Sequence, residues 1–176
     1  MRDVTVVVSI DTEEDNWHRT RTGVTVENIA ELRTLATCFE RLGIRPTYFT
    51  SYQVAIDPRA AETLREVSAA GRAEIGAHLH PWNTPPLDEA FVPRNSMLKN
   101  LPAALQRAKL GRLTTALEQA FGRAPRAFRA GRYGLGRDTV AALLAGGYQV
   151  DSSVSPFIDL AARDDGPSFV GAPMEP

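Results

Sequence analysis

The chain has 176 residues, of which 43% are hydrophobic and 23% are charged, and its formal net charge at pH 7 is −1. This composition is typical of one globular domain with a buried core, and it excludes a fibrous or disordered chain. The near-neutral charge argues against nucleic acid or an anionic membrane surface as a partner, because both need a basic excess. We therefore predict a single domain over residues 1–176.

Apolar runs, the N-terminal residues and the cysteine content indicate where in the cell the protein is expected. Apolar runs stay well short of the ~20 residues that a membrane-spanning helix needs, so no membrane segment is expected. Residues 1–10 pass directly into a valine-rich run without the features of a signal peptide, which predicts a cytoplasmic protein. Cys38 is the single cysteine, and its place in an apolar helical pattern predicts a buried thiol.

Hydrophobic patterns predict strands that alternate with helices. The predicted strands are short, largely apolar runs at 4–10, 46–50, 74–79, 127–130 and 149–151. The continuous, valine-rich run at 4–10 suits a strand buried on both faces. The predicted helices repeat apolar residues at spacings of three and four, at 26–42, 58–70, 102–121 and 137–145. Gly43 and Gly71 follow the first two helices as stop signals, and Pro58 opens the second. This alternation indicates the α/β class with a mostly parallel sheet of about five strands.

Two pairs of ionisable residues follow predicted strands. His78 and His80 end the third strand, and Asp11 and Glu13 follow the first. Side chains two apart on an extended strand point to the same side, so both imidazoles can face one point. In parallel α/β folds ligands bind at the carboxyl ends of the strands, where these pairs should meet. Glu13, His78 and His80 would supply two histidines and a carboxylate, an established ligand set for hydrolytic zinc.

Three more polar residues follow the later strands. Arg129 and Tyr133 come after the fourth strand, and Asp151 closes the fifth. A cation beside a carboxylate favours its ionised form, so Arg129 near Asp11 would set the state of a general base. Asp151 also has an ordinary explanation, since aspartate often ends a strand.

Neighbouring residues have simpler interpretations. Glu14 and Asp15 are expected to be solvated. Gly131, Gly134 and Gly136 are expected to serve backbone turning, because their order is not the G-x-G-x-x-G that opens a helix after a first strand. A dinucleotide site is therefore not predicted.

The ordered motifs SIDTEED, EIGAHLHPW, FRAGRYG and VDSSVSP resemble those of the polysaccharide deacetylase family, which includes chitooligosaccharide and peptidoglycan deacetylases. The resemblance implies that Asp11 is the catalytic base and that Glu13 and His78 bind the metal. It implies an incomplete (β/α) barrel as the fold.

The same resemblance assigns roles to the residues after the later strands. It implies that Arg129 orients the base, that the backbone N–H of Tyr133 binds the oxyanion, and that Asp151 tunes the general acid.

The sequence departs from the family pattern in two places. The family spaces its metal histidines four apart, and Trp82 stands at that position here, so His80 takes the place of the second ligand. The family's fifth motif supplies a histidine as general acid on a later strand, and no histidine follows His80. Family domains have seven or eight strands, so an open edge after the fifth strand leads us to expect that the domain is truncated at its C-terminal end.

Taken together, the resemblance implies a zinc-dependent hydrolase that removes an N-acetyl or similar acyl group from an amino sugar or polysaccharide. Without the general acid, the 176 residues alone are expected to be nearly inactive. Two alternatives stay open: an amidohydrolase or phosphoesterase of the barrel type, and a non-catalytic carbohydrate-binding domain. The sequence leaves open the sugar, the acyl group and the oligomeric state.

Overall fold

A single parallel sheet forms the centre of the protein. The structure is a computed structural model, and it describes residues 5–15 and 20–172. The strands are β1 (Ser9–Thr12), β2 (Thr47–Thr50), β3 (Glu74–Leu79), β4 (Ala127–Ala130) and β5 (Val150–Asp151). They pair in the order β1-β2-β3-β4-β5, each parallel to its neighbour. The predicted α/β class and the number of strands are confirmed.

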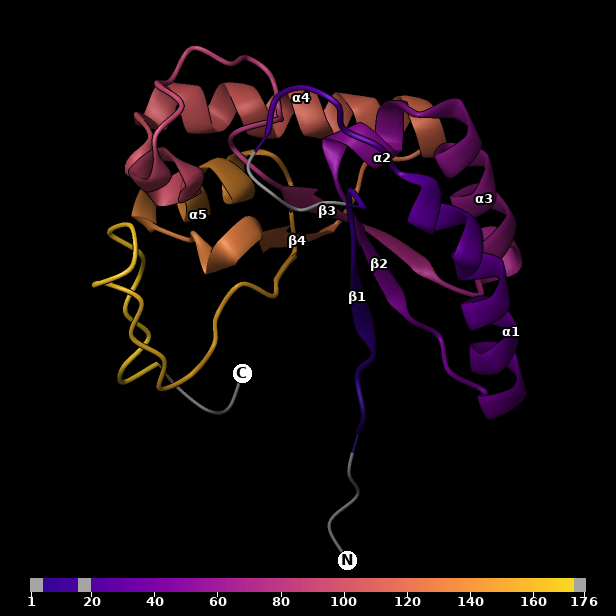
Figure 1. Cartoon of the computed structure of the whole chain (residues 1–176). Helices are drawn as coiled ribbons and strands as arrows, with labels where there is room; N and C mark the ends of the chain where they lie inside the picture. The colour runs from indigo at the N-terminus through magenta and orange to yellow at the C-terminus, as the bar shows by residue number, and fades with distance from the viewer. Residues whose placement is uncertain (1–4, 16–19, 173–176) are drawn as a thin grey trace, which may run out of the picture.

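Helices connect the strands. They are α1 (Leu32–Leu42), α2 (Tyr52–Ile56), α3 (Pro58–Ser68), α4 (Ala103–Phe121) and α5 (Arg137–Ala145), with short 3₁₀ helices at Glu27–Glu31, Ala69–Gly71, Pro93–Ser96, Leu98–Asn100 and Gly131–Tyr133. Figure 1 shows α1 and α3 side by side along one end of the sheet, while α4 packs against α2 and α5. Within the described ranges, none of these helices is long and apolar enough to span a bilayer.

Local signals account for most of the element boundaries. Strands β3 and β4 and helix α5 have the predicted bounds, and Gly43 ends α1 in the left-handed region with φ 66°. Helix α2 was not predicted, because its five residues are too few to show a helical period. Ser51 caps it by accepting a hydrogen bond from the Val54 N–H at 3.5 Å.

Two predictions about buried residues are wrong. The valine run at 4–10 was expected to form a strand buried on both faces, but β1 begins only at Ser9, and Val6 and Val7 are 79% and 81% exposed. In the described part of the chain β1 is an edge strand paired with β2 alone, so Val6 and Val7 meet no second layer, while Val4 lies outside the described residues. Cys38 is exposed, because the buried stripe of α1 runs through Leu32 and Ala36 on the opposite side of the helix.

The two faces of the sheet differ in chemistry. Apolar side chains at alternate positions belong to the core that the helices cover, namely Tyr48, Ile75, Ala77, Leu79, Phe128 and Ala130. The intervening positions carry Asp11, Phe49, His78 and Arg129, with Asp11 beside Phe49 and His78 beside Arg129 in the register. The polar residues therefore share the face turned away from the helical core.

Candidate metal centre

Three predicted ligands converge on one point. The Nε2 atoms of His78 and His80 lie 3.0 Å apart, and Glu13 Oε2 lies 3.3 Å from the first and 2.9 Å from the second. His78 is the second-last residue of β3, His80 comes just after that strand on the same face, and Glu13 comes just after β1. In the described ranges these are the residues whose ligand atoms come close enough together to hold a metal ion.

The spacing of these atoms fits a divalent metal. Zinc bonds to nitrogen and oxygen are about 2.0–2.1 Å long, so neighbouring ligands of a tetrahedral site lie about 3.3 Å apart. The three observed separations are close to that value. Both histidine side chains are at most 5% exposed, whereas Glu13 is 25% exposed, so one side of the site faces the open end of the sheet.

The orientation of His78 is fixed by the neighbouring strand. Its Nδ1 lies 3.0 Å from the backbone carbonyl oxygen of Arg129. Because a carbonyl oxygen can only accept, Nδ1 carries the proton in this bond. The lone pair of a neutral His78 ring is then on Nε2, which faces Glu13. Metal-binding histidines are commonly held by such a contact.

His80 is packed tightly on two sides. Its ring stacks on that of Trp82, with the centroids 4.2 Å apart and the planes inclined by 17°. Gly131 lies against its edge, and a Cβ at this position would overlap His80 Cδ2 and lie 2.8 Å from the Leu79 carbonyl oxygen. Gly131 is therefore required for a close approach, which the prediction of backbone turning did not foresee. Trp82 therefore supports the ring of His80 from one face.

The charges of the three groups depend on one another. Burial alone would raise the pKa of the Glu13 carboxyl, but hydrogen bonds and charge from His78 and His80 outweigh it and hold the pKa well below its usual range. Burial alone would lower the pKa of His80, but Glu13 and Glu14 outweigh it and raise that pKa to about 9. The metal-free site therefore favours an ionised Glu13 carboxylate beside a protonated His80 ring.

A second cluster lies beside the ligands. Arg129 Nη1 donates to Asp11 Oδ1 at 2.7 Å, and Nη2 donates to the hydroxyls of Ser9 and Ser152, each at 2.7 Å. The guanidinium also lies over the Phe49 ring, 4.3 Å from its centroid. Arg129 is thus held from four directions, and it in turn fixes the carboxylate of Asp11. The predicted pairing of these two residues is confirmed.

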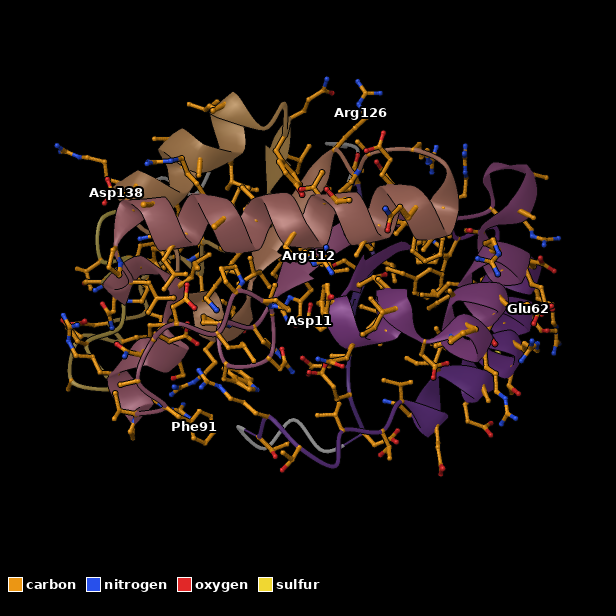
Figure 2. The ribbon with its side chains drawn as sticks, turned by 90° about the horizontal axis from the view of Figure 1, so that it is seen from above. Asp11, Glu62, Phe91, Arg112, Arg126 and Asp138 are labelled. Atoms are coloured by element: carbon orange, nitrogen blue, oxygen red, sulfur yellow. The ribbon has the colours of Figure 1, made fainter. Side chains whose placement is uncertain are left out.

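Both clusters open into a hollow of about 250 Å³ at the carboxyl ends of the strands. It is lined by Asp11, Glu13, His78, His80, Trp82, Met97, Arg129, Ala130, Arg132, Tyr133, Leu160 and Arg163. Figure 2 looks down on the molecule from above and places Asp11 near its centre and Phe91 near its edge. Substrate entering the hollow would meet the metal ligands and the Asp11–Arg129 pair together.

Two residues with strained backbone lie on one wall of this hollow. Arg132 and Tyr133 have φ values of 54° and 59°, in the left-handed region that side-chain-bearing residues rarely adopt. Such residues cost about 1–3 kcal/mol each and are frequent at functional sites. Arg132 donates to Ser96 Oγ and, at 2.7 Å, to Asp164 Oδ2, and these bonds hold the turn in place. Tyr133 is 45% exposed.

Asp151 occupies a different position from the other predicted site residues. It is not among the residues that line the hollow. Its two carboxylate oxygens accept from Ser153, one from the backbone N–H at 3.0 Å and one from the hydroxyl at 2.7 Å. The residue as a whole is exposed, yet the protein around its carboxyl raises the pKa through burial, against the opposing effect of Ser153 and Arg129. Its proposed role in tuning a general acid stays a prediction.

The prediction that Glu14 and Asp15 are solvated is half wrong. Glu14 is buried, with a side-chain exposure of 3%, and it accepts a hydrogen bond from the Asn83 side chain. Asp15 is exposed and accepts from the backbone N–H groups of Glu27 and Asn28 at 2.9 and 2.7 Å, as a capping residue does. No local pattern distinguishes the two neighbours, because the burial of Glu14 depends on Asn83, 69 positions away.

Comparison with known proteins relates the chain to one group of folds. No protein-family model matches it, and no curated protein is similar to it in sequence. Among solved structures, a putative polysaccharide deacetylase from Mycobacterium smegmatis superposes with a TM-score of 0.62 at 21% identity, over 84% of this chain and 50% of that one.

Two further solved structures are similar to the chain in fold. The chitin deacetylase of the fungal pathogen Colletotrichum lindemuthianum has a TM-score of 0.53 at 20% identity, over 68% of this chain and 48% of that chain. A CE4-family pseudoenzyme from Bacillus anthracis has a TM-score of 0.59 at 14% identity, over 82% of this chain and 41% of that chain.

These similarities show that the chain has the fold of the CE4-family polysaccharide deacetylases. The identities are all low, so what they show is the fold and not a particular member. The chain spans 41% to 50% of the length of these three structures.

Proposed function

We propose that the protein is a metal-dependent hydrolase that removes an acyl group, such as acetyl, from an amino sugar or a related carbohydrate. The observation that carries this proposal is the convergence of Glu13, His78 and His80 next to the Asp11–Arg129 ion pair. The fold shared with deacetylases acting on carbohydrates supports the choice of substrate class.

The proposed metal is zinc, held by Glu13, His78 and His80. When bound, a divalent ion would polarise the acyl carbonyl and lower the pKa of a coordinated water toward ~7. Zinc suits this ligand set because two imidazoles and one carboxylate leave a position open for water.

The remaining residues would move the protons and stabilise charge. Asp11, held in place by Arg129, accepts a proton from the attacking water. The backbone N–H of Tyr133, in the strained turn beside the ligands, donates to the oxygen that becomes negative in the transition state. Asp151 stays a proposed influence on the general acid.

Among the described residues that line the hollow, no histidine other than the two metal ligands is present to protonate the leaving amine. None of the three histidines of the chain lies after His80. Amide hydrolysis by this chain alone should therefore be slow, whereas an ester with a good leaving group needs no such donor.

Two measurements test the proposal. Metal analysis of the purified chain should give one zinc per molecule, and His78→Ala and Glu13→Ala should lose it. The wild type should then hydrolyse 4-nitrophenyl acetate with a dependence on added zinc, and the two variants should not. A chain without stoichiometric metal would overturn the proposal, as would release of phosphate from a phosphoester in preference to acetate from an ester.

A second candidate is a non-catalytic carbohydrate-binding domain. It is favoured by the missing proton donor and by the similarity to a CE4-family pseudoenzyme. This candidate predicts that an N-acetylated oligosaccharide binds to the metal-free chain, and that neither the amide nor the aryl ester is hydrolysed when zinc is added. Hydrolysis of the aryl ester on addition of zinc separates the two candidates, because only the hydrolase predicts it.

A further inference from the structure

His80 has a second acidic neighbour on the side of its ring away from Glu13. Its Nδ1 lies 3.7 Å from Glu14 Oε1, just beyond hydrogen-bond length. The side chains of His80 and Glu14 are 5% and 3% exposed. The contact is therefore shielded from water, where the charge of a carboxylate acts strongly on a neighbouring ring.

Glu14 is held in this position by the turn that follows His80. Asn83 Nδ2 donates to Glu14 Oε1, the Thr84 N–H donates to the His80 carbonyl oxygen at 3.1 Å, and Gln53 Nε2 donates to the Asn83 carbonyl oxygen at 2.9 Å. The loop after β1 and the turn after β3 are thereby joined next to the ligand. This arrangement has no role in the chemistry described above.

Several polar atoms at this junction are left without a hydrogen bond. Within the described part of the protein, His80 Nδ1, Glu14 Oε2 and Asn83 Oδ1 are buried and have no hydrogen-bond partner. An unpaired buried polar group is destabilising. A small decrease in the distance between His80 Nδ1 and the Glu14 carboxylate, enough to form a hydrogen bond, would therefore be favourable. His78 already has the corresponding bond, from its Nδ1 to the Arg129 carbonyl oxygen.

We propose that Glu14 is a positioning residue that accepts a hydrogen bond from His80 Nδ1–H and thereby directs the His80 Nε2 lone pair toward the metal. Asn83 holds the Glu14 carboxylate for this purpose. The inference rests on the proposed metal site and adds to it two residues that do not touch the metal. It explains how a histidine two residues after His78 can serve as the second ligand.

The zinc affinity of Glu14→Gln tests this role. Glutamine keeps the size of the side chain and an oxygen that can accept from Asn83, so the fold should be retained, which urea unfolding of the zinc-free proteins checks. Competition with a chromophoric chelator should give a zinc Kd about 10–100-fold higher than that of the wild type. The control is Glu27→Gln, at an exposed carboxylate, which should leave the Kd unchanged.

A double-mutant cycle shows whether Glu14 acts through His80. In a His80→Cys background, which keeps a metal-binding side chain but removes the ring, Glu14→Gln should not weaken zinc binding further. Asn83→Ala should weaken zinc binding in the wild type but not in Glu14→Gln. An equal loss in both backgrounds, or an unchanged Kd in Glu14→Gln, would overturn the inference. A wild type that binds no zinc would overturn the proposed function itself, so the two failures are distinguishable.

Discussion

Arg129 and Asp11 lie 118 positions apart in the chain and meet in an ion pair of 2.7 Å at the carboxyl ends of β4 and β1. Since β1 and β4 are separated by two strands in the sheet, the pair reaches across the face that carries the metal ligands. The long Arg129 side chain spans this distance over the ring of Phe49. The ion pair places Asp11, the candidate base, and Arg129, which holds it, on the same face as Glu13.

The first prediction concerns this ion pair. Arg129→Gln should lower the zinc-dependent hydrolysis of 4-nitrophenyl acetate about 10²-fold, because an unheld Asp11 carboxylate loses much of the benefit of a positioned base. The zinc Kd should stay the same, since Arg129 contacts the ligands only through its backbone. Arg126→Gln, at an exposed arginine, is the control. A Kd that rises with the loss of activity would show that Arg129 supports the metal site instead.

The second prediction concerns pH. The pKa of His80 in the metal-free protein is raised to about 9, above the ~6.5 of an unfolded chain. The folded state therefore holds an extra proton between these values, and the metal-free chain should lose stability as the pH rises from ~6.5 to about 9. Zinc must displace that proton, so zinc affinity should increase over the same range.

Two measurements check the pH prediction. Calorimetry in buffers of different ionisation enthalpy should show close to one proton released per zinc at neutral pH. Thermal unfolding should give opposite pH slopes for the metal-free and the zinc-loaded proteins. Identical slopes, or zinc binding without proton release, would mean that His80 is neutral before the metal binds.

The third prediction concerns Gly131. A Cβ at this position would overlap the His80 ring, so Gly131→Ala should displace the ligand and raise the zinc Kd at least about 10-fold. Gly111→Ala is the matched control, because apart from its chain neighbours and the nearby backbone of α4 no atom lies within 4 Å of its Cβ position. That substitution should stabilise the protein by about 0.5–1 kcal/mol and leave zinc binding unchanged. Equal zinc affinity in both variants would contradict the close approach.

The fourth prediction concerns Lys109, whose side chain is fully buried. Its Nζ donates to the carbonyl oxygens of Pro81, Thr84 and Pro86 at 2.6 to 2.8 Å and lies 2.9 Å from Glu89 Oε2. Replacing it with methionine leaves these buried oxygens unpaired, so we expect a loss of about 3 kcal/mol in the free energy of unfolding.

Urea denaturation measures the effect of Lys109→Met. Arg107→Met is the control on the same helix, because Arg107 is exposed and should change the stability by less than about 0.5 kcal/mol. Lys109→Met combined with Glu89→Leu should recover part of the loss. Similar stability in the Lys109 and Arg107 variants would mean that the loop after β3 does not depend on this ammonium group.

The fifth prediction concerns the missing proton donor. The chain should hydrolyse an aryl acetate much faster than an N-acetylated amino sugar, because only the amine needs protonation as it leaves. Added imidazole buffer should accelerate release of acetate from the amide and have little effect on the zinc-dependent hydrolysis of the ester. Rapid amide hydrolysis without added imidazole would mean that a residue of this chain already supplies the proton.

The sequence by itself determined the features that depend on local spacing. Alternation along β3 places His78 and His80 on one face, and the same period places Asp11 on the polar side of β1. Helical periodicity and stop signals determined α3, α4 and α5 to within two residues, and they determined the end of α1, whose predicted first turns at 27–31 form a 3₁₀ helix instead. These properties can be predicted from the sequence because each depends only on residues a few positions away in the chain.

The tertiary structure decided every relationship that depends on a distant partner. Glu14 and Asp15 are adjacent, yet one is buried against Asn83 and the other caps a 3₁₀ helix. Only the packing of β3 against β4 shows that Gly131 makes room for the His80 ring. The valine-rich pattern before β1 predicts a buried strand, but Val6 and Val7 are exposed because no second layer of the described chain covers them. Local sequence fixes the direction of a side chain, whereas the fold determines what it meets.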